Sequence, residues 1–120
     1  MKLLKCHCGA IEAEIKAPKS LEKIIRCNCS LCKRKGAVMS LVKNEDFKII
    51  KGAEKLKLYQ FHTKVARHFF CSICGIYTHH NPRSNPAMTG FNLGCIDGLD
   101  TFDLKNIAIN DGHNHPLDKK

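Results

Sequence analysis

Short alternations of apolar and polar residues run along most of this sequence and predict β-strands. Residues 11–15 place an apolar side chain at every second position, which is the period of a strand with one buried face. Similar apolar runs of strand length follow, separated by glycine, proline or polar residues. The expected strands cover residues 11–15, 21–26, 37–42, 47–50, 56–61, 65–70, 76–80, 88–95 and 107–109.

Helical periodicity is nearly absent from the chain. No segment repeats apolar residues every three or four positions over a useful length, which argues against a helical bundle. We expect one helical turn at residues 99–104 and a loop at residues 27–32. The sequence therefore predicts an all-β fold, mainly antiparallel, with little helix.

The length and composition fit one globular domain. The chain has 120 residues, of which 43 % are hydrophobic, enough to bury a core and to exclude a wholly disordered protein. We assign residues 1–120 to a single domain, with residues 113–120 as a polar tail that is expected to fray. No apolar stretch approaches the roughly 20 residues of a membrane span, and the N-terminus lacks the apolar core of a secretion signal. We therefore expect a cytoplasmic protein without a membrane role.

The charge balance is strongly basic. The formal net charge is +9, from 20 lysines and arginines against 11 acidic residues, and such a surplus is typical of nucleic-acid-binding proteins. The basic residues are spread along the chain, however, with one cluster at residues 33–35. Zinc-bound thiolates would reduce the charge further, by about 2 for a four-cysteine site and about 1 for a three-cysteine site. We therefore do not expect nucleic acid to be the partner.

The eight cysteines are the most informative residues, because seven of them fall into three tight groups. Disulfide partners are usually separated along a chain, whereas metal ligands gather on short turns that aim two thiolates at one ion. In a reducing cytoplasm the thiols stay free, so zinc is favoured over a disulfide framework. The groups are Cys6 and Cys8; Cys27, Cys29 and Cys32; and Cys71 and Cys74.

The spacing suggests two kinds of zinc site. Cys71 and Cys74, followed by a glycine, form half of a zinc ribbon. The pair Cys6 and Cys8 is also followed by a glycine and is the obvious second half of a closed four-thiolate site. The three cysteines within residues 27–32 would leave the fourth position of a zinc open for water or for a substrate thiolate.

Spacing alone leaves other ligand assignments open. A four-cysteine set drawn from the first two groups also fits, and a histidine could close the second site. Cys95 is either a buried apolar residue, as isolated cysteines often are, or a ligand that closes the second site. His68 is expected to be an ordinary strand residue. His79 and His80 alternate on a strand, so at most one of them can face a site and act as a proton shuttle.

The order of these motifs resembles that of the glutathione-dependent formaldehyde-activating enzymes, a family that also contains centromere protein V. The motifs are CHCGA, CNCSLC with basic residues and Gly-Ala after it, RHFFCSICG and FNLGCIDG, and the match spans residues 6–111. The resemblance implies antiparallel sheets bridged by zinc, a fold called a β-tent. It also implies two ligand sets: Cys6, Cys8, Cys71 and Cys74 for a structural zinc, and Cys27, Cys29 and Cys32 for a second, catalytic zinc.

The activity implied by the resemblance is carbon–sulfur bond formation, in which glutathione and formaldehyde give S-hydroxymethylglutathione, a reaction of the carbon–sulfur lyase class. At the second zinc an incoming thiol would be deprotonated to the thiolate that attacks the aldehyde carbon. The partners would be a small-molecule thiol and an aldehyde, with Lys33 and Arg34 attracting the glutathione carboxylates. For these two residues the alternative is a solvated loop. For the whole protein the alternatives are a zinc-stabilised binding module and a glutathione carrier without catalysis. None of the motifs bears on the oligomeric state.

Overall fold

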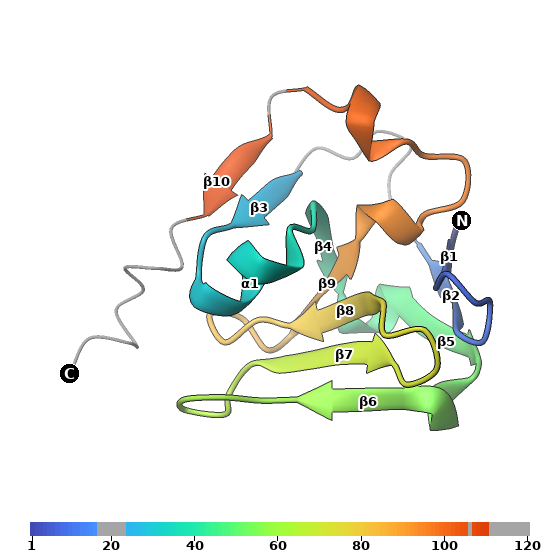
Figure 1. Ribbon diagram of the computed structural model, residues 1–120, viewed down its shortest axis with the longest axis horizontal. Helices are drawn as coiled ribbons and strands as arrows, with labels where there is room; N and C mark the ends of the chain where they lie inside the picture. The colour runs from blue at the N-terminus through green and yellow to red at the C-terminus, as the bar shows by residue number, and fades with distance from the viewer. Residues whose placement is uncertain (17–23, 106, 111–120) are drawn as a thin grey trace.

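The residues that the structure describes form ten strands in two sheets (Figure 1). The computed structural model describes residues 1–16, 24–105 and 107–110, and it confirms the all-β prediction. The strands are β1 (Lys2–Lys5), β2 (Glu12–Ile15), β3 (Ile25–Cys27), β4 (Met39–Lys43), β5 (Phe47–Lys51), β6 (Leu56–Tyr59), β7 (Arg67–Cys71), β8 (Tyr77–Asn81), β9 (Met88–Asn92) and β10 (Ala108–Asn110). The helical elements of this part of the chain are α1 (Ser30–Lys35) and the 3₁₀ turns η1 (Asn44–Asp46), η2 (Ala53–Lys55), η3 (Leu93–Cys95) and η4 (Thr101–Asp103).

The strands form one large and one small sheet. The large sheet has seven strands in the order β10-β3-β4-β9-β8-β7-β6, and the small sheet has three in the order β1-β2-β5. Within the described chain, neighbouring strands are antiparallel except for β10, which pairs in parallel with β3. β10 thus ties the C-terminal end of the described chain to the strand that ends at Cys27.

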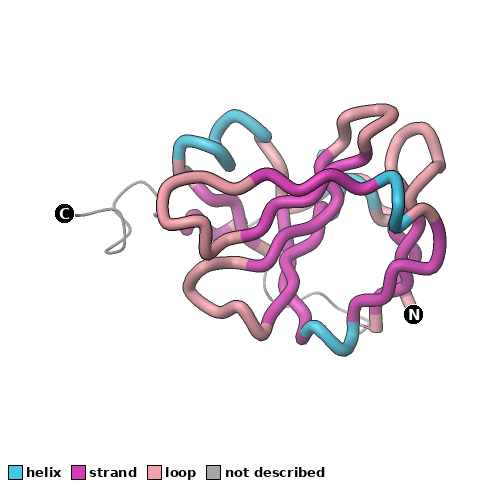
Figure 2. The backbone as a smooth tube through the Cα atoms, turned by 90° about the horizontal axis from the view of Figure 1, so that it is seen from below, coloured by secondary structure: helices cyan, strands magenta, loops and turns pink. Residues whose placement is uncertain are grey.

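The main core fills the space between the two sheets, which face each other in Figure 2. In β2, Ala13 and Ile15 are fully buried, whereas the alternating Glu12 and Glu14 are partly exposed. Phe91 of β9 is fully buried in the same core from the side of the large sheet. Each fully buried large apolar side chain contributes roughly 1.5–3 kcal/mol, so this shared core holds the small sheet against the large one.

Two differences from the expected strands concern β1 and β9. The pattern does not predict β1, because only two apolar residues lie between its lysines; its Leu4 is nevertheless fully buried. The strand expected at residues 88–95 ends at Asn92, whose side chain accepts a hydrogen bond from the backbone N–H of Gly94 at 3.0 Å and starts η3. The helical turn expected at residues 99–104 is present as η4. Part of one expected strand, residues 21–23, and the expected tail, residues 113–120, lie outside the described residues.

The short helix α1 corrects the loop expected at residues 27–32. Cys29 caps its N-terminus, because its sulfur accepts a hydrogen bond from the backbone N–H of Cys32 at 3.3 Å. Gly36 ends the helix in the left-handed conformation, with φ +65°, and three basic residues in the last turn suit the negative end of the helix dipole. No helix of the described chain is both long enough and apolar enough to cross a bilayer.

Candidate functional site

The four-thiol cluster, which unites thiols from two distant turns, is the first candidate metal centre. It consists of Cys6, Cys8, Cys71 and Cys74. All four sulfur atoms lie within 4.8 Å of one another, and Cys8 Sγ lies 3.7 Å from both Cys6 Sγ and Cys71 Sγ. Tetrahedral zinc with Zn–S bonds of about 2.3 Å separates its sulfurs by about 3.8 Å, so this donor set fits such an ion.

The two turns of the four-thiol cluster share one local geometry. Gly9 and Gly75 follow the second cysteine of each pair with φ +80° and +78°, a conformation that glycine adopts freely. Each glycine N–H donates to the carbonyl of the first cysteine, at 3.2 Å and 2.8 Å. A further backbone N–H donates to the buried sulfur, at 3.3 Å for Cys6 and 3.4 Å for Cys71. Both turns therefore offer backbone donors to a sulfur that would bind a metal ion.

The four-thiol cluster also joins the two sheets. One pair of its cysteines follows β1 of the small sheet, and the other pair connects β7 with β8 of the large sheet. A metal ion held here would therefore bridge the sheets across one side of the core.

The three-thiol cluster of Cys27, Cys29 and Cys32 is the second candidate metal centre. Its three sulfur atoms also lie within 4.8 Å of one another. β3 ends at Cys27, and the other two cysteines lie at the cap and in the first turn of α1, so one short segment supplies all three thiols. Hydrogen bonds from the Cys27 thiol, then from the Cys32 thiol and backbone, lower the pKa of Cys29 and favour its thiolate.

Cys95 belongs to neither cluster. It lies in the main core, where its thiol donates to the Tyr77 carbonyl at 3.7 Å and burial raises the pKa of the thiol to about 12. Among the described residues, no further cysteine, histidine or carboxylate ligand atom gathers with the three-thiol cluster. The thiols thus come together as four and three, and all eight cysteines are free of disulfides.

A cavity of about 340 Å³ adjoins the three-thiol cluster. Its walls come from strands of the large sheet, from the hairpin between β6 and β7 and from the loop between β8 and β9. Its size, and its apolar walls interrupted by a few polar groups, are typical of small-molecule sites. The lining residues are Ile25, Cys27, Cys29, Cys32, Met39, Leu41, Phe61, Thr63, Ala66, His68, His80, Pro82, Arg83, Ser84, Asn85 and Met88.

Two histidines line this cavity from neighbouring strands, His68 on β7 and His80 on β8. Their rings stack with centroids 5.5 Å apart. His79 instead contacts the rings of Phe47 and Phe69, so only one of the two adjacent histidines of β8 lines the cavity, as expected for neighbours on a strand. Burial lowers the pKa of His68 and His79 to about 4 and that of His80 to about 3. All three rings are therefore neutral at neutral pH.

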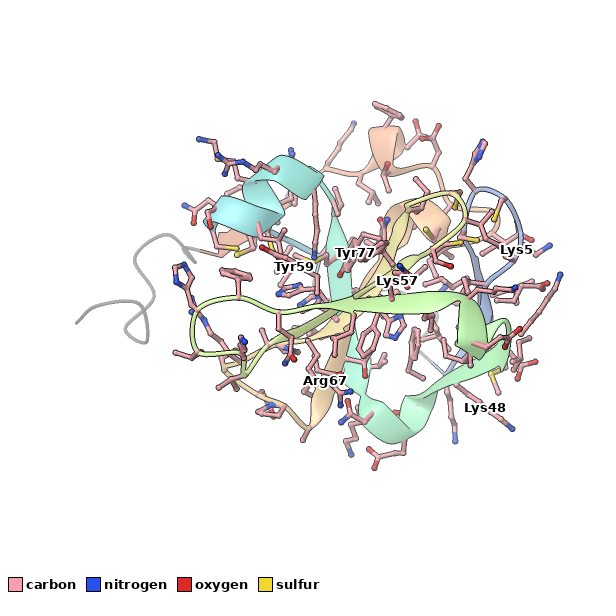
Figure 3. The ribbon with its side chains drawn as sticks, turned by 60° about the horizontal axis from the view of Figure 1, so that its bottom comes forward. Lys5, Lys48, Lys57, Tyr59, Arg67 and Tyr77 are labelled. Carbon is pink, nitrogen blue, oxygen red and sulfur yellow. The ribbon has the colours of Figure 1, made fainter. Side chains whose placement is uncertain are left out.

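Lys35, the third residue of the basic cluster predicted at residues 33–35, contacts a residue that lines the cavity. It lies in the last turn of α1, with Nζ 2.9 Å from His68 Nδ1 and 3.7 Å from the centroid of the Tyr77 ring. Figure 3 shows Tyr77 beside α1. Burial lowers the pKa of Lys35, and the charges of the three thiolates oppose that shift. Because α1 ends at the following glycine, Lys35 lies one helical turn after Cys32.

The other two residues of the predicted basic rim, Lys33 and Arg34, are exposed on α1 and do not line the cavity. Arg34 Nη1 donates to the Ser30 carbonyl at 2.7 Å. The arginine that does line the cavity is Arg83, in the loop after β8, which no sequence pattern marks. Contact between glutathione and Lys33 or Arg34 stays a prediction, and Arg83 is a further candidate for binding a carboxylate.

Other basic residues are dispersed over the surface. Lys5, Lys48, Lys57 and Arg67, labelled in Figure 3, come from the four strands β1, β5, β6 and β7. The expectation that nucleic acid is not the partner stays a prediction.

Comparison with known proteins identifies the family. The family model of the glutathione-dependent formaldehyde-activating enzymes matches residues 2–108. The chain belongs to this family. A crystal structure of a Rhodobacter sphaeroides protein from structural genomics is also similar: it is 43 % identical, with 92 % of this chain and all of that chain (100 %) covered and a TM-score of 0.86. The resemblance seen in the sequence motifs is confirmed. Membership of the formaldehyde-activating family points to an enzyme acting on glutathione and formaldehyde, and each thiol cluster could hold a metal ion.

Proposed function

We propose that this protein is a zinc-dependent enzyme of the carbon–sulfur lyase type, which joins glutathione and formaldehyde to give S-hydroxymethylglutathione. One observation carries the proposal: three thiols that can hold a metal border a cavity, with no fourth ligand among the described residues. A metal with three protein ligands keeps one position for an exchangeable ligand, and a thiolate suits that position. Family membership supports glutathione and formaldehyde as the two substrates.

The two clusters have different roles in this proposal. The four-thiol cluster holds a structural zinc, because four thiolates complete a tetrahedral coordination sphere. The three-thiol cluster, Cys27, Cys29 and Cys32, holds the catalytic zinc. Zinc is the ion that best matches soft, closely spaced thiolates without redox chemistry. When bound at the second cluster, it supplies a positive centre that favours the thiolate form of an incoming thiol.

The residues of the chain itself bind and orient the substrates. Arg83 at the cavity wall is suited to a glutathione carboxylate, and Lys33 and Arg34 add positive charge on the segment that carries the thiols. The apolar part of the wall keeps bulk water from the reacting sulfur. The glutathione thiolate attacks the formaldehyde carbon, the C–S bond forms, and the carbonyl electron pair moves to the oxygen, which takes a proton from solvent.

We propose that this chemistry takes place in the cytoplasm and within one domain, residues 1–120. All eight cysteines are free, and free thiols persist in a reducing compartment. The same compartment maintains the glutathione pool that the reaction needs.

Native mass spectrometry of the freshly reduced protein tests the metal part of the proposal. We expect two zinc ions per chain, with glutathione either joining the complex or releasing one zinc. Two zinc ions that are indifferent to glutathione would contradict an open second site and favour a zinc-stabilised binding module.

The rate of S-hydroxymethylglutathione formation, measured above the uncatalysed rate, tests catalysis. We expect the wild type to accelerate the reaction and Cys29→Ser to abolish the acceleration. Cys95→Ala is the matched control, because it removes a thiol outside both clusters and should retain the activity. Glutathione binding without any acceleration would identify a glutathione carrier instead.

A further inference from the structure

Lys35 and His68 form a partly buried contact between helix α1 and the wall of the cavity. Lys35 Nζ lies 2.9 Å from His68 Nδ1. The His68 side chain is 6 % exposed and lines the cavity beside the three-thiol cluster. Phe61 and His80 stack against its ring, with centroids 5.9 Å and 5.5 Å away. The His68 ring is therefore held in place by two neighbouring rings and by the contact of its Nδ1 with Lys35.

The contact with Lys35 decides which nitrogen of His68 carries the hydrogen. A lysine ammonium has three donors and no acceptor, so Nζ donates and Nδ1 accepts. A neutral ring whose Nδ1 accepts carries its hydrogen on Nε2. Burial, and then the charge of Lys35, lower the pKa of His68 to about 4, which keeps the ring neutral. Burial lowers the pKa of Lys35, whereas the nearby thiolate charges oppose that shift and the Tyr77 ring, 3.7 Å from Nζ, favours the ammonium form.

Nε2 of His68 lies open to the cavity side. It has no hydrogen-bond partner within residues 1–16, 24–105 and 107–110, and no side-chain nitrogen of those residues is both fully buried and unpaired. His68 borders both the thiol cavity and a second cavity of about 350 Å³, and Lys35 lines only the second. Nδ1 contacts Lys35 and therefore lies toward the second cavity. Nε2 is then the ring nitrogen that lies toward the thiol cavity.

His80, the other histidine of the cavity, is not fixed in this way. Its Nδ1 forms a hydrogen bond with the Tyr77 hydroxyl at 2.5 Å. A tyrosine hydroxyl can donate or accept, and this hydroxyl also has Met39 Sδ within 3.3 Å as an acceptor. Either nitrogen of His80 can therefore carry the hydrogen, whereas His68 presents a defined donor.

We propose that His68 donates an Nε2–H hydrogen bond to the substrate oxygen at the three-thiol site, and that Lys35 is the positioning residue that fixes this tautomer. The inference rests on the proposed function and names a catalytic residue for it. As the C–S bond forms, the carbonyl π pair moves to the oxygen, and the negative charge develops there. The neutral imidazole stabilises that charge without losing its own proton. The oxygen then takes a proton from water. The proton that the glutathione thiol released to solvent before the attack balances this uptake.

Ring NMR of the zinc-loaded protein with isotope-labelled histidine tests the tautomer. We expect the hydrogen of His68 on Nε2 in the wild type, and a shift toward the Nδ1–H form in Lys35→Met. Glutathione and formaldehyde form their adduct in solution without a catalyst, and this mixture should shift the Nε2–H signal more than glutathione alone. A wild-type ring protonated on Nδ1, or a signal indifferent to the adduct, would overturn the inference.

Variants at position 68 test the effect on the rate. His68→Leu should lower kcat about 10²-fold, the lower end of what one oxyanion donor contributes, with zinc content and glutathione KM unchanged. His68→Gln keeps an N–H near the Nε2 position and should recover most of the loss. His79→Gln is the matched control, because His79 is also buried but lines neither cavity, and its kcat should stay near the wild-type value.

The outcomes separate the inference from the proposed function. Equal kcat values for His68→Leu and wild type would overturn the inference alone. If His68→Leu fails to fold, Lys35→Met replaces it, and its kcat should fall together with the change of tautomer. A wild type without any acceleration would overturn the proposed function, and the NMR response to the adduct would then decide whether His68 contacts the substrate oxygen.

Discussion

The four-thiol cluster joins turns whose cysteines, Cys8 and Cys71, lie 63 residues apart, whereas the three-thiol cluster comes from residues 27–32 alone. The first packs against apolar side chains such as Ile11 and Leu56, and the second borders a cavity of about 340 Å³. A metal in the first therefore cross-links the fold, and a metal in the second organises one segment and faces small molecules. The ligand atom is the same in both clusters, so connectivity and surroundings separate the two roles.

The largest expected effect comes from Cys71→Ala, which breaks the cross-linking cluster. We expect loss of the metal from that cluster together with loss of cooperative folding, because metal binding supplies about 10 kcal/mol or more in small metal-stabilised domains. Zinc content and a thermal melt followed by circular dichroism measure both. A variant that melts at the wild-type temperature would contradict the cross-linking role.

Cys29→Ser tests the other cluster with the opposite expectation. Serine still caps α1, since a hydroxyl is a good N-cap acceptor, but it is a poor replacement for a thiolate ligand. We expect one zinc to be lost, the fold to be kept and adduct formation to fall to the uncatalysed rate. Mass spectrometry, circular dichroism and kinetics check the three parts. Unfolding of this variant would mean that both clusters are structural.

Gly90→Ala should perturb the cavity wall and spare the four-thiol cluster. Gly90 of β9 lies opposite His80 of β8, and a Cβ there would come within 2.2 Å of the His80 ring. We expect displacement of the ring and a loss of about 1–3 kcal/mol in the free energy of unfolding, measured by urea denaturation. The double variant Gly90→Ala/His80→Ala makes room for the new methyl group. Additive losses in the double variant would contradict a clash between these two positions.

The smallest effect expected at neutral pH concerns His79, which is buried and lines neither cavity. Burial lowers its pKa from 6.5 to about 4, so the unfolded chain binds a proton at a higher pH than the folded one. The contribution of His79 to the free energy of unfolding is therefore present above pH 6.5 and falls as the pH drops toward 4. His79→Phe should flatten the pH dependence by about one proton over this window while leaving the zinc content unchanged. Urea denaturation at several pH values measures the difference, and identical slopes would contradict it.

Local patterns were sufficient to predict most strands and the grouping of the cysteines. Alternation and turn residues act over a few positions, and each cysteine group lies on one short segment. Helix α1 was missed because six residues are too few for helical periodicity, and its N-cap, Cys29, is not one of the usual capping residues. Arg83 and Phe61 were missed for another reason. They reach the cavity through the pairing of distant strands, which no local pattern contains.

A β-bulge in β8 is another feature that local sequence patterns do not predict. Phe69 pairs with His79 but Phe70 pairs with Tyr77, so Thr78 is an extra residue in the strand. Strict alternation would place residues 77 and 80 on opposite faces. The bulge removes that constraint, and Tyr77 and His80 form a hydrogen bond. A prediction based on strict alternation along the strand therefore misses this contact.

The separation of the two halves of the four-thiol cluster also sets an order of events during synthesis. At ordinary translation rates, the 63 residues between Cys8 and Cys71 take on the order of 10 s to make. The three-thiol segment is complete once Cys32 is added to the chain, when six of the seven strands described in the large sheet are still to be made. The nascent chain can thus load its reactive centre before its cross-link exists. A chain arrested between Cys32 and Cys71 should accordingly bind one metal ion and not two.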